Sequence, residues 1–294
     1  MADVGARVVV RYRLPAGSTP PMTDVIGHLV AVGPTLSVRS KRGDLVDIAA
    51  EDVVAIKALS DAPVRTGDIR NLEHAAASGW PGVEQQWVRG WLLRFGHGST
   101  RRANSAVPLN VYNRADVEAL VDWYAARGLA PLVAAPDRLF RIPPGVPTDA
   151  ENLVMTGDLP VGESDRAVTI AAGPDDEWRD LYRREVPVDV LTAVIDGEVA
   201  FATIAGAAVG RAAVTTAPDG ARWVGLSAVH VLVEARRRGL ARGLCSALLC
   251  WGGERGATRA YVQVLADNTA ATRLYESMGF AVHHRSRYVD ARSL

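Results

Sequence analysis

The chain has 294 residues, of which 48% are hydrophobic and 22% charged, as in an ordinary folded protein with room for two or three compact units. Its formal net charge is zero, so no global field gathers nucleic acid or an anionic membrane, and neither is expected as a partner. No apolar run approaches the roughly 20 residues that span a bilayer, and no signal peptide is recognisable, so we expect a cytoplasmic protein.

Residues 1–60 predict a small all-β domain. Alternating β-branched residues in Ala6–Leu14 indicate a first strand, and further short strands follow between breaker-rich loops such as Gly33-Pro34. Five short strands without a helical period favour an SH3-like barrel. Tyr12 is the only aromatic residue in this segment. A packing or partner-docking module is therefore favoured over a nucleic-acid-binding one.

Residues 65–145 predict a second, α+β segment. A helix is expected over residues 68–79, ended by Gly79, and another over residues 114–128. Two strands are expected between them, over residues 87–98 and 101–109. The stretch Arg141–Asn152 is rich in proline, glycine and polar residues and is the best domain boundary in the chain.

Residues 150–294 predict a third segment, an α+β sandwich around a mixed sheet. Helices are expected over residues 175–185 and 268–279, and a further helix follows the turn at Gly239. Strands are expected over residues 190–199 and 200–216, with a hairpin signal at Asp196-Gly197. Further strands are expected at Val229–Val233, over residues 259–266 and over residues 280–289.

The two cysteines, Cys245 and Cys250, lie five residues apart in a helical run. This is not a zinc-ligand spacing, and one pair in a chain of this size is no disulfide framework. We interpret both as small apolar fillers in a reducing compartment and expect no metal.

An arginine-rich turn joins the strand at Val229 to the helix that begins at Leu240. Val229, Val231 and Val233 alternate as a strand whose edge could pair with an extended ligand. Gly239 and Ala241 would let bulky groups approach the backbone. The helix beginning here presents unpaired amides to an anion, and Arg237, Arg238 and Arg242 would add positive charge toward a phosphate.

This turn and a second stretch downstream together resemble the GCN5-related N-acetyltransferase (GNAT) superfamily. Its phosphate loop, Arg/Gln-x-x-Gly-x-Gly/Ala, is matched by Arg236, Gly239 and Ala241. Its second signature, Asn-x-x-Ala-x-x-Leu-Tyr-x-x-x-Gly-Phe, is matched in full by Asn268, Ala271, Leu274, Tyr275, Gly279 and Phe280. The resemblance covers about residues 165–294, and the whole chain is similar to actinobacterial members with an N-terminal SH3-like domain.

The resemblance implies a mixed-sheet acyltransferase domain that binds acetyl-CoA, with no metal. The backbone of Val229 to Val231 is expected to pair with the pantetheine arm, and the amides of Arg237 to Arg242 to hold the pyrophosphate. Tyr275 is expected to protonate the departing thiolate. The residues expected to bind the cofactor are Val229, His230, Val231, Arg236, Arg237, Arg238, Gly239, Leu240, Ala241, Arg242, Gly243, Asn268 and Tyr275.

The sequence departs from the family pattern at the general base that deprotonates the attacking amine. Two positions where relatives carry glutamate hold Gln263 and Gly225. The base is therefore elsewhere, is a water chain, or has been lost. His230, Glu177 and the pair His283-His284 are substitute candidates.

The form of residues 123–135 repeats that of residues 274–286, with Tyr124 falling where Tyr275 falls. We therefore hypothesise that residues 65–145 are a degenerate GNAT half that packs or shapes a cleft but does not bind CoA.

The activity implied by the resemblance is acetyl transfer from acetyl-CoA to a primary amine by direct attack. The alternative is a weakly active or inactive CoA-binding sensor or scaffold protein that uses the SH3-like module for docking. The acceptor stays open between a small molecule and a protein, and a homodimer is among the open oligomeric states.

Overall fold

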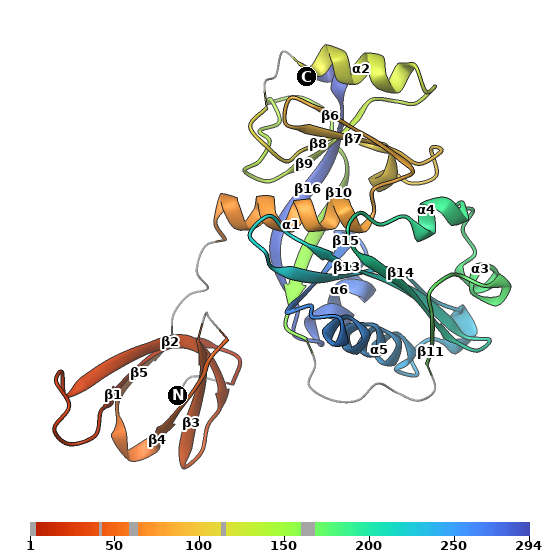
Figure 1. Cartoon of the computed structure of the whole chain (residues 1–294). Coiled ribbons are helices and arrows are strands. Elements are labelled where there is room, and N and C mark those ends of the chain that lie inside the picture. Colours follow the sequence, from red (N-terminus) through yellow and green to blue (C-terminus); the bar gives the residue numbers. More distant parts are fainter. Residues whose placement is uncertain (1–3, 41–42, 59–63, 113–115, 160–167) are drawn as a thin grey trace. The chain divides into compact units, whose positions relative to one another are not determined.

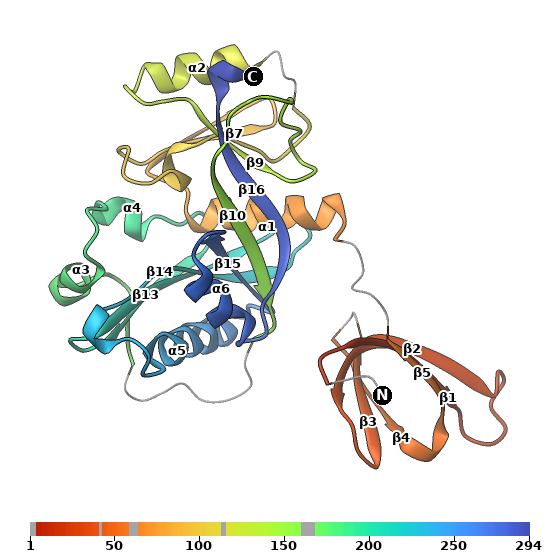
Figure 2. The same ribbon diagram turned by 180° about the vertical axis from the view of Figure 1, so that it is seen from behind.

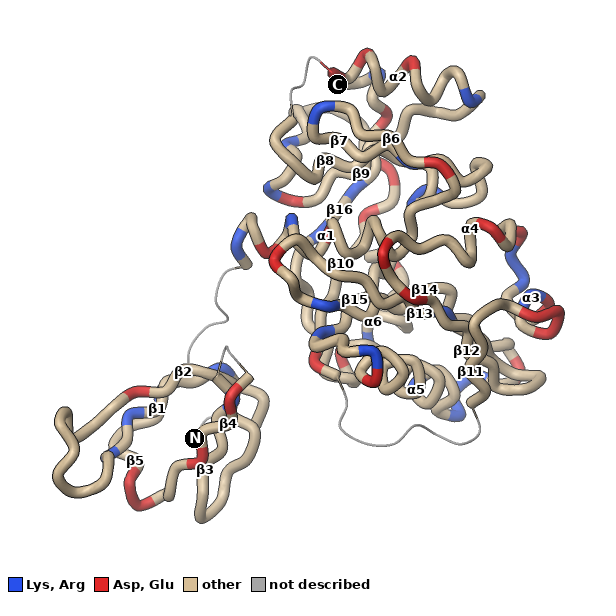
Figure 3. Tube along the Cα trace, viewed as in Figure 1, with Lys and Arg blue, Asp and Glu red and all other residues tan. Residues whose placement is uncertain are grey.

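A computed structural model describes residues 4–40, 43–58, 64–112, 116–159 and 168–294. The chain separates into two compact units, Met1–Pro63 and Val64–Leu294 (Figure 1). Basic and acidic residues are interspersed along both (Figure 3), as the zero net charge leads one to expect. Among the described residues, no helix combines the length and hydropathy that a membrane crossing requires.

The first unit is a five-stranded antiparallel sheet in the order β4-β3-β2-β1-β5. Alternation places Val8, Val10 and Val38 at zero exposure in its core, which is what period-two patterning predicts for a sheet with one buried face. Its strands are β1 (Arg7–Arg13), β2 (Met22–Ala31), β3 (Thr35–Ser40), β4 (Leu45–Ala49) and β5 (Val53–Ala58).

The second unit is built on a mixed eight-stranded sheet in the order β11-β12-β13-β14-β15-β10-β16-β9. All its neighbouring strands pair antiparallel except β14 and β15, which are parallel. The strands are β9 (Leu132–Pro136), β10 (Asp149–Gly157), β11 (Thr169–Ala171), β12 (Glu198–Ile204), β13 (Ala208–Thr216), β14 (Arg222–Val231), β15 (Arg259–Leu265) and β16 (Ala281–Asp290).

Helices cover both faces of this sheet. On one face, α5 (Leu240–Glu254) buries Leu244, Leu248 and Leu249 against the central strands. On the other, α1 (Thr66–Gly79) buries Leu72 against β10, β14 and β15. The remaining helices are α2 (Val117–Ala125), α3 (Asp176–Tyr182), α4 (Val188–Thr192) and α6 (Thr269–Glu276).

The boundary expected in Arg141–Asn152 covers the connection from β9 to β10 and the first residues of β10. Both strands belong to this one sheet. β10 lies between β15 and β16, and Figures 1 and 2 show β10 and β16 running side by side. The sequence carries no signal for this arrangement, because β9 and β10 pair with strands more than a hundred residues further along the chain.

Several expected strands fold differently. The strand expected over residues 87–98 is a hairpin, β6 (Glu84–Val88) and β7 (Trp91–Phe95), turned at Arg89 and Gly90 with φ of 41° and 92°. Of the strand expected over residues 101–109, only β8 (Val107–Pro108) is extended, and it joins these two in a three-stranded sheet. The strand expected over residues 190–199 begins within α4 and only its last two residues lie in β12; the hairpin turn falls at Gly206, with φ of 62°, between β12 and β13.

The order of helices and strands around Tyr124 differs from the order around Tyr275, with which it was aligned. α2, which carries Tyr124, lies between β8 and β9, and a parallel bridge joins Ala106 to Val133 across them. α2 thus takes the place that α5 takes between the parallel strands β14 and β15, whereas Tyr275 lies on α6, before β16. The Tyr124 hydroxyl donates to the carbonyl of Arg94 (3.1 Å) in a buried core. The start of the expected helix 114–128 lies partly outside the described residues.

Candidate active site

The strand β14 loses one of its neighbours halfway along. It pairs with β15 only from Trp223 to Leu226, whereas its pairing with β13 continues to Val231. A bulge at Ala228, with φ of 52°, coincides with the divergence. Within the described chain, no strand covers the β15-side edge of residues 227–231. This edge can therefore accept an extended ligand through backbone hydrogen bonds.

The turn that follows leads directly into the N-terminus of α5. Gly239 caps the helix with φ of 78°, in the left-handed region that favours glycine. A Cβ there would meet no other atom of the chain within 4 Å, so within the protein it is the backbone conformation that favours glycine at this position. The Gly243 amide donates to the Gly239 carbonyl (3.1 Å). The amides of Leu240 to Arg242 precede it and have no intrahelical acceptor, a geometry that suits an anion.

The arginines of the turn differ in exposure and in hydrogen bonding. Arg237 and Arg238 are exposed. The Arg236 Nε donates to the Val231 carbonyl (3.2 Å) and ties the turn to the strand. The Arg242 guanidinium, expected to add charge toward a phosphate, is exposed and donates to the carbonyl (3.1 Å) and hydroxyl (2.6 Å) of Ser277 at the end of α6. Arg242 therefore fastens α5 to α6, as a cation at a helix C-terminus does.

Asn268 and Tyr275, the two expected cofactor residues of the second signature, lie at the start and near the end of α6. The Asn268 Oδ1 accepts from the Ala271 amide (3.1 Å), so Asn268 is the N-cap of the helix. Tyr275 is only 4% exposed and packs against Phe280 in the core under α5. The structure thus gives Asn268 a local structural role that the motif alone did not predict.

The Tyr275 hydroxyl is hydrogen-bonded to the thiol of Cys245 on α5. Burial raises the pKa of Tyr275 well above its usual range, with the neighbouring Cys245 as a further cause. Burial likewise raises the pKa of Cys245 to about 12. Both groups therefore keep their protons at neutral pH, and Tyr275 remains able to donate one.

Gly225 and Gln263, the two positions that lack the expected glutamate, have different surroundings. At Gly225, a Cβ would lie 2.2 Å from Cζ of Tyr261, so the Tyr261 ring fills the space that a carboxylate would need. Gln263 is half-buried and lines a small cavity together with Glu73 of α1. Tyr261 and Glu73 were not singled out from the sequence, because neither belongs to a motif.

Two families of known proteins together match nearly the whole chain. The family described as "Probable histone acetyltransferase Rv0428c C-terminal" matches residues 66–289, and the one described as "Rv0428c N-terminal Sm-like domain" matches residues 2–57. The chain belongs to the Rv0428c family. It is a GNAT-type acyltransferase, and its N-terminal β domain, expected to be SH3-like, is of the Sm-like kind.

Individual relatives support this family assignment. The "Probable histone acetyltransferase Rv0428c" of Mycobacterium tuberculosis is 52% identical over 293 residues, covering 99% of this chain and 96% of that protein. Two solved structures show the same fold. A putative GNAT-family acetyltransferase from Novosphingobium aromaticivorans has a TM-score of 0.54 at 21% identity, and a GCN5-related N-acetyltransferase from Kribbella flavida has 0.53 at 18%. They cover 76% of this chain and 97% and 96% of their own.

In this Rv0428c-family domain a buried arginine organises the face opposite α5. Arg211 on β13 is 1% exposed, and its guanidinium donates to the carbonyls of Leu191 (2.6 Å), Gly79 (3.0 Å) and Ala193 (2.9 Å) and to Ser227 Oγ (3.2 Å). Burial lowers the pKa of Arg211 to about 9. The residue joins α1, α4 and the diverging part of β14, and it lies over the Trp80 ring at 4.4 Å.

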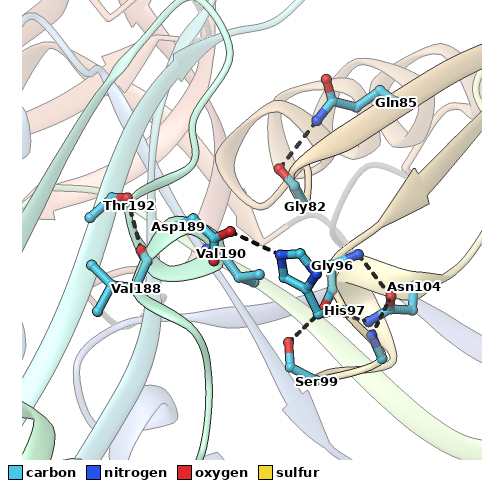
Figure 4. Close-up of polar contacts among 11 residues, drawn as sticks. Gly82, Gln85, Gly96, His97, Ser99, Asn104, Val188, Asp189, Val190 and Thr192 are labelled. Atoms are coloured by element: carbon cyan, nitrogen blue, oxygen red, sulfur yellow. Dashed lines mark hydrogen bonds and ion pairs between the residues drawn. The ribbon is translucent and has the colours of Figure 1, made fainter.

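A second contact ties the β7 loop to α4 beside this face. The His97 Nε2 lies 2.8 Å from Asp189 Oδ2 of α4 (Figure 4). Asn104 supports the loop from within, because its Oδ1 accepts from the amides of Gly96 (2.8 Å) and Gly98 (3.0 Å). The hydrogen bond from His97 holds the pKa of Asp189 below its usual range. The loop after β7 is thus joined to α4 and supported from within by Asn104.

The substitute base candidates have distinct surroundings. His230 is half-buried on β14, and burial lowers its pKa, with the charges of Arg236, Arg183 and Arg184 acting in the same direction. Glu177 accepts from the Gly206 amide (2.8 Å) and stabilises the β12–β13 turn. His284 is 5% exposed, and its Nε2 lies 2.7 Å from Glu73 Oε1. Within the described residues, no group of three or more His, Cys, Asp or Glu could share a metal ion.

Proposed function

We propose that this acyltransferase moves an acetyl group from acetyl-CoA to a primary amine by direct attack. The observation that carries the proposal is the divergence of β14 from β15 after Leu226, immediately before the turn into α5. An uncovered strand edge followed by a helix N-terminus suits a ligand with an amide-bearing arm and a pyrophosphate.

The cofactor would lie along this edge in the order of the chain. The backbone of Val229, His230 and Val231 would pair with the pantetheine arm. The amides of Leu240, Ala241 and Arg242 would hold the pyrophosphate, and the exposed guanidinium groups of Arg237 and Arg238 would neutralise its charge. Gly239 supports this by supplying the left-handed turn, with φ of 78°.

The chemistry would use Tyr275 as the proton donor to the departing sulfur. Its raised pKa keeps the hydroxyl protonated at neutral pH, and Cys245 holds the hydroxyl in place. A backbone amide of β14 near Val231 would polarise the thioester carbonyl. The acceptor remains an amine of a small molecule or of a protein, and the relatives' name makes histone a probe to include.

The first test is acetyl-CoA titration by calorimetry, followed by thiol release on a panel of small amines and on histone. We expect micromolar binding and amine-dependent thiol release. Tyr275→Phe should lower turnover about 10-fold or more and leave the acetyl-CoA Kd nearly unchanged. Tyr12→Phe, in the other unit, is the matched control and should change neither quantity.

Binding without turnover on every acceptor would favour the CoA-sensing alternative. An absence of binding would contradict the assignment of the turn. Equal turnover by wild type and Tyr275→Phe would remove Tyr275 as the proton donor while leaving the cofactor site standing.

A further inference from the structure

A small polar cavity lies under α1 where β15 diverges from β14. Its volume of about 10 Å³ is room for about one water molecule. It is lined by Gln263 of β15, by Glu73 of α1 and by two guanidinium groups, Arg94 and Arg102. The remaining polar lining residues are Asn152, Ser286 and Tyr288. Such a lining offers a water the two to four polar partners that a buried water needs.

The cavity adjoins the opening of the sheet. The last paired residues of β14 and β15 are Leu226 and Val262, and Gln263 is the next residue of β15. Ser227 is the next residue of β14 and, continuing the register, belongs to the same face of the sheet as Gln263. A group that reaches the open edge from this face therefore arrives beside the cavity.

Glu73 is the carboxylate of this cavity and is itself tightly held. It is 5% exposed, and its Oε1 lies 2.7 Å from Nε2 of His284. The Nδ1 of His284 lies 2.9 Å from Nδ1 of His283. A consistent set of neutral tautomers has His284 donating to Glu73 and accepting from His283. The second histidine thus fixes the tautomer of the first, and the first orients the carboxylate.

The other charged groups at the cavity are guanidinium groups, which disfavour a further cation there. Arg94 is 4% exposed, and its guanidinium donates to the carbonyl (3.2 Å) and hydroxyl (3.0 Å) of Ser105. Arg102 lies over the Trp80 ring at 5.6 Å. With these guanidinium groups beside it, a protonated water or an ammonium is disfavoured, and a released proton is best held on a carboxylate. The titratable and charged groups around Glu73 are His284, His283, His74, Arg94, Arg102, Tyr261 and Tyr288.

We propose that Glu73 is the proton acceptor for the attacking amine, through one water held in this cavity beside Gln263. The inference rests on the acetyl transfer proposed above. The bound alkylammonium gives one N–H proton to the water while a proton of that water passes to Glu73. The free amine nitrogen then bonds to the acetyl carbon as the carbon–sulfur bond breaks. Tyr275 gives its proton to the sulfur, and the second N–H proton of the adduct passes to the Tyr275 phenolate. Exchange with solvent then restores the Glu73 carboxylate.

The test is Glu73→Gln, which keeps a hydrogen-bonding partner for His284. We expect kcat/KM for the best amine to fall about 10²-fold at pH 7, with an unchanged acetyl-CoA Kd. The deficit should shrink as the pH rises toward the amine's own pKa, because the free amine then needs no base. A role confined to packing would give a deficit of the same size at every pH and would overturn the proposal.

Two further variants sharpen the result. Glu151→Gln removes a carboxylate of β10 that pairs with Arg287 (2.7 Å), and it should leave kcat/KM unchanged. Gln263→Glu in the Glu73→Gln background returns a carboxylate to the same cavity and should restore part of the rate. If Glu73→Gln does not fold, Gln263→Leu decides, since it fills the cavity without touching the Glu73–His284 bond, and full activity there would overturn the proposal.

The outcomes separate the two proposals. Wild-type transfer that Glu73→Gln leaves intact would refute the role of Glu73 alone. Failure of wild type to acetylate any amine would refute the proposed function and this inference with it.

Discussion

The ring of Tyr261 occupies the space that a side chain at Gly225 would need, with Cζ 2.2 Å from the position of a Cβ. Tyr261 is 6% exposed and is packed beside Trp223. Packing against Tyr261 on the neighbouring parallel strand therefore requires glycine at position 225. For the same reason, the ring of Tyr261 excludes a carboxylate side chain from this position.

Gly225→Ala should accordingly destabilise the protein by about 1–3 kcal/mol through overpacking. Urea unfolding followed by circular dichroism measures this. Gly253→Ala on α5 is the matched control, because the nearest contact of its Cβ would be Leu159 at 3.6 Å; it should be neutral or slightly stabilising. Equal stability of Gly225→Ala and wild type would contradict the packing argument.

Gly239→Ala should destabilise the α5 N-terminus although the space around it is empty. An alanine at φ of 78° costs about 1–2 kcal/mol, and relaxing the turn would move the amides of Leu240 to Arg242. We expect a lower Tm and a weaker acetyl-CoA affinity by calorimetry. An unchanged Tm together with an unchanged Kd would show that the turn does not need the left-handed conformation.

The arginines of the turn should separate into two classes. Arg237→Ala and Arg238→Ala should each raise the acetyl-CoA Kd several-fold, with a loss that diminishes at high salt because exposed charges are screened. Arg242→Ala should instead lower Tm, because it removes two hydrogen bonds to Ser277. Calorimetry at two ionic strengths and a thermal melt of each variant distinguish the classes, and a salt-dependent Kd effect confined to Arg242 would reverse the assignment.

Stability should fall as the pH drops from 7 toward 4. Burial, with the neighbouring His284 as a second cause, lowers the pKa of His283 to about 4. Between about pH 6.5 and 4 the unfolded chain therefore binds a proton that the folded chain does not, so the free energy of unfolding decreases with falling pH in that window. His283→Gln should flatten this slope in urea titrations at several pH values. An unaltered slope in His283→Gln would contradict this origin.

Local interactions shape much of the proposed cofactor side. The turn has a left-handed residue, Gly239, at the start of α5, and Asn268 caps α6 through a contact three residues away. All these interactions join residues close in the chain, so a linear motif records them. The resemblance to GNAT proteins rested on these positions, and the family is confirmed.

The proposed acceptor side depends on the tertiary structure. β10 enters between β15 and β16, α1 brings Glu73 to His284 across 211 positions of the chain, and Tyr261 fills the place at Gly225. Arg211 likewise joins Gly79 to Leu191. Pairings of this kind depend on strand register and on which helix covers which face, and neither leaves a periodic signal in the residues themselves. The sequence therefore identified the missing carboxylates, and only the fold brought a buried carboxylate to their side of the sheet.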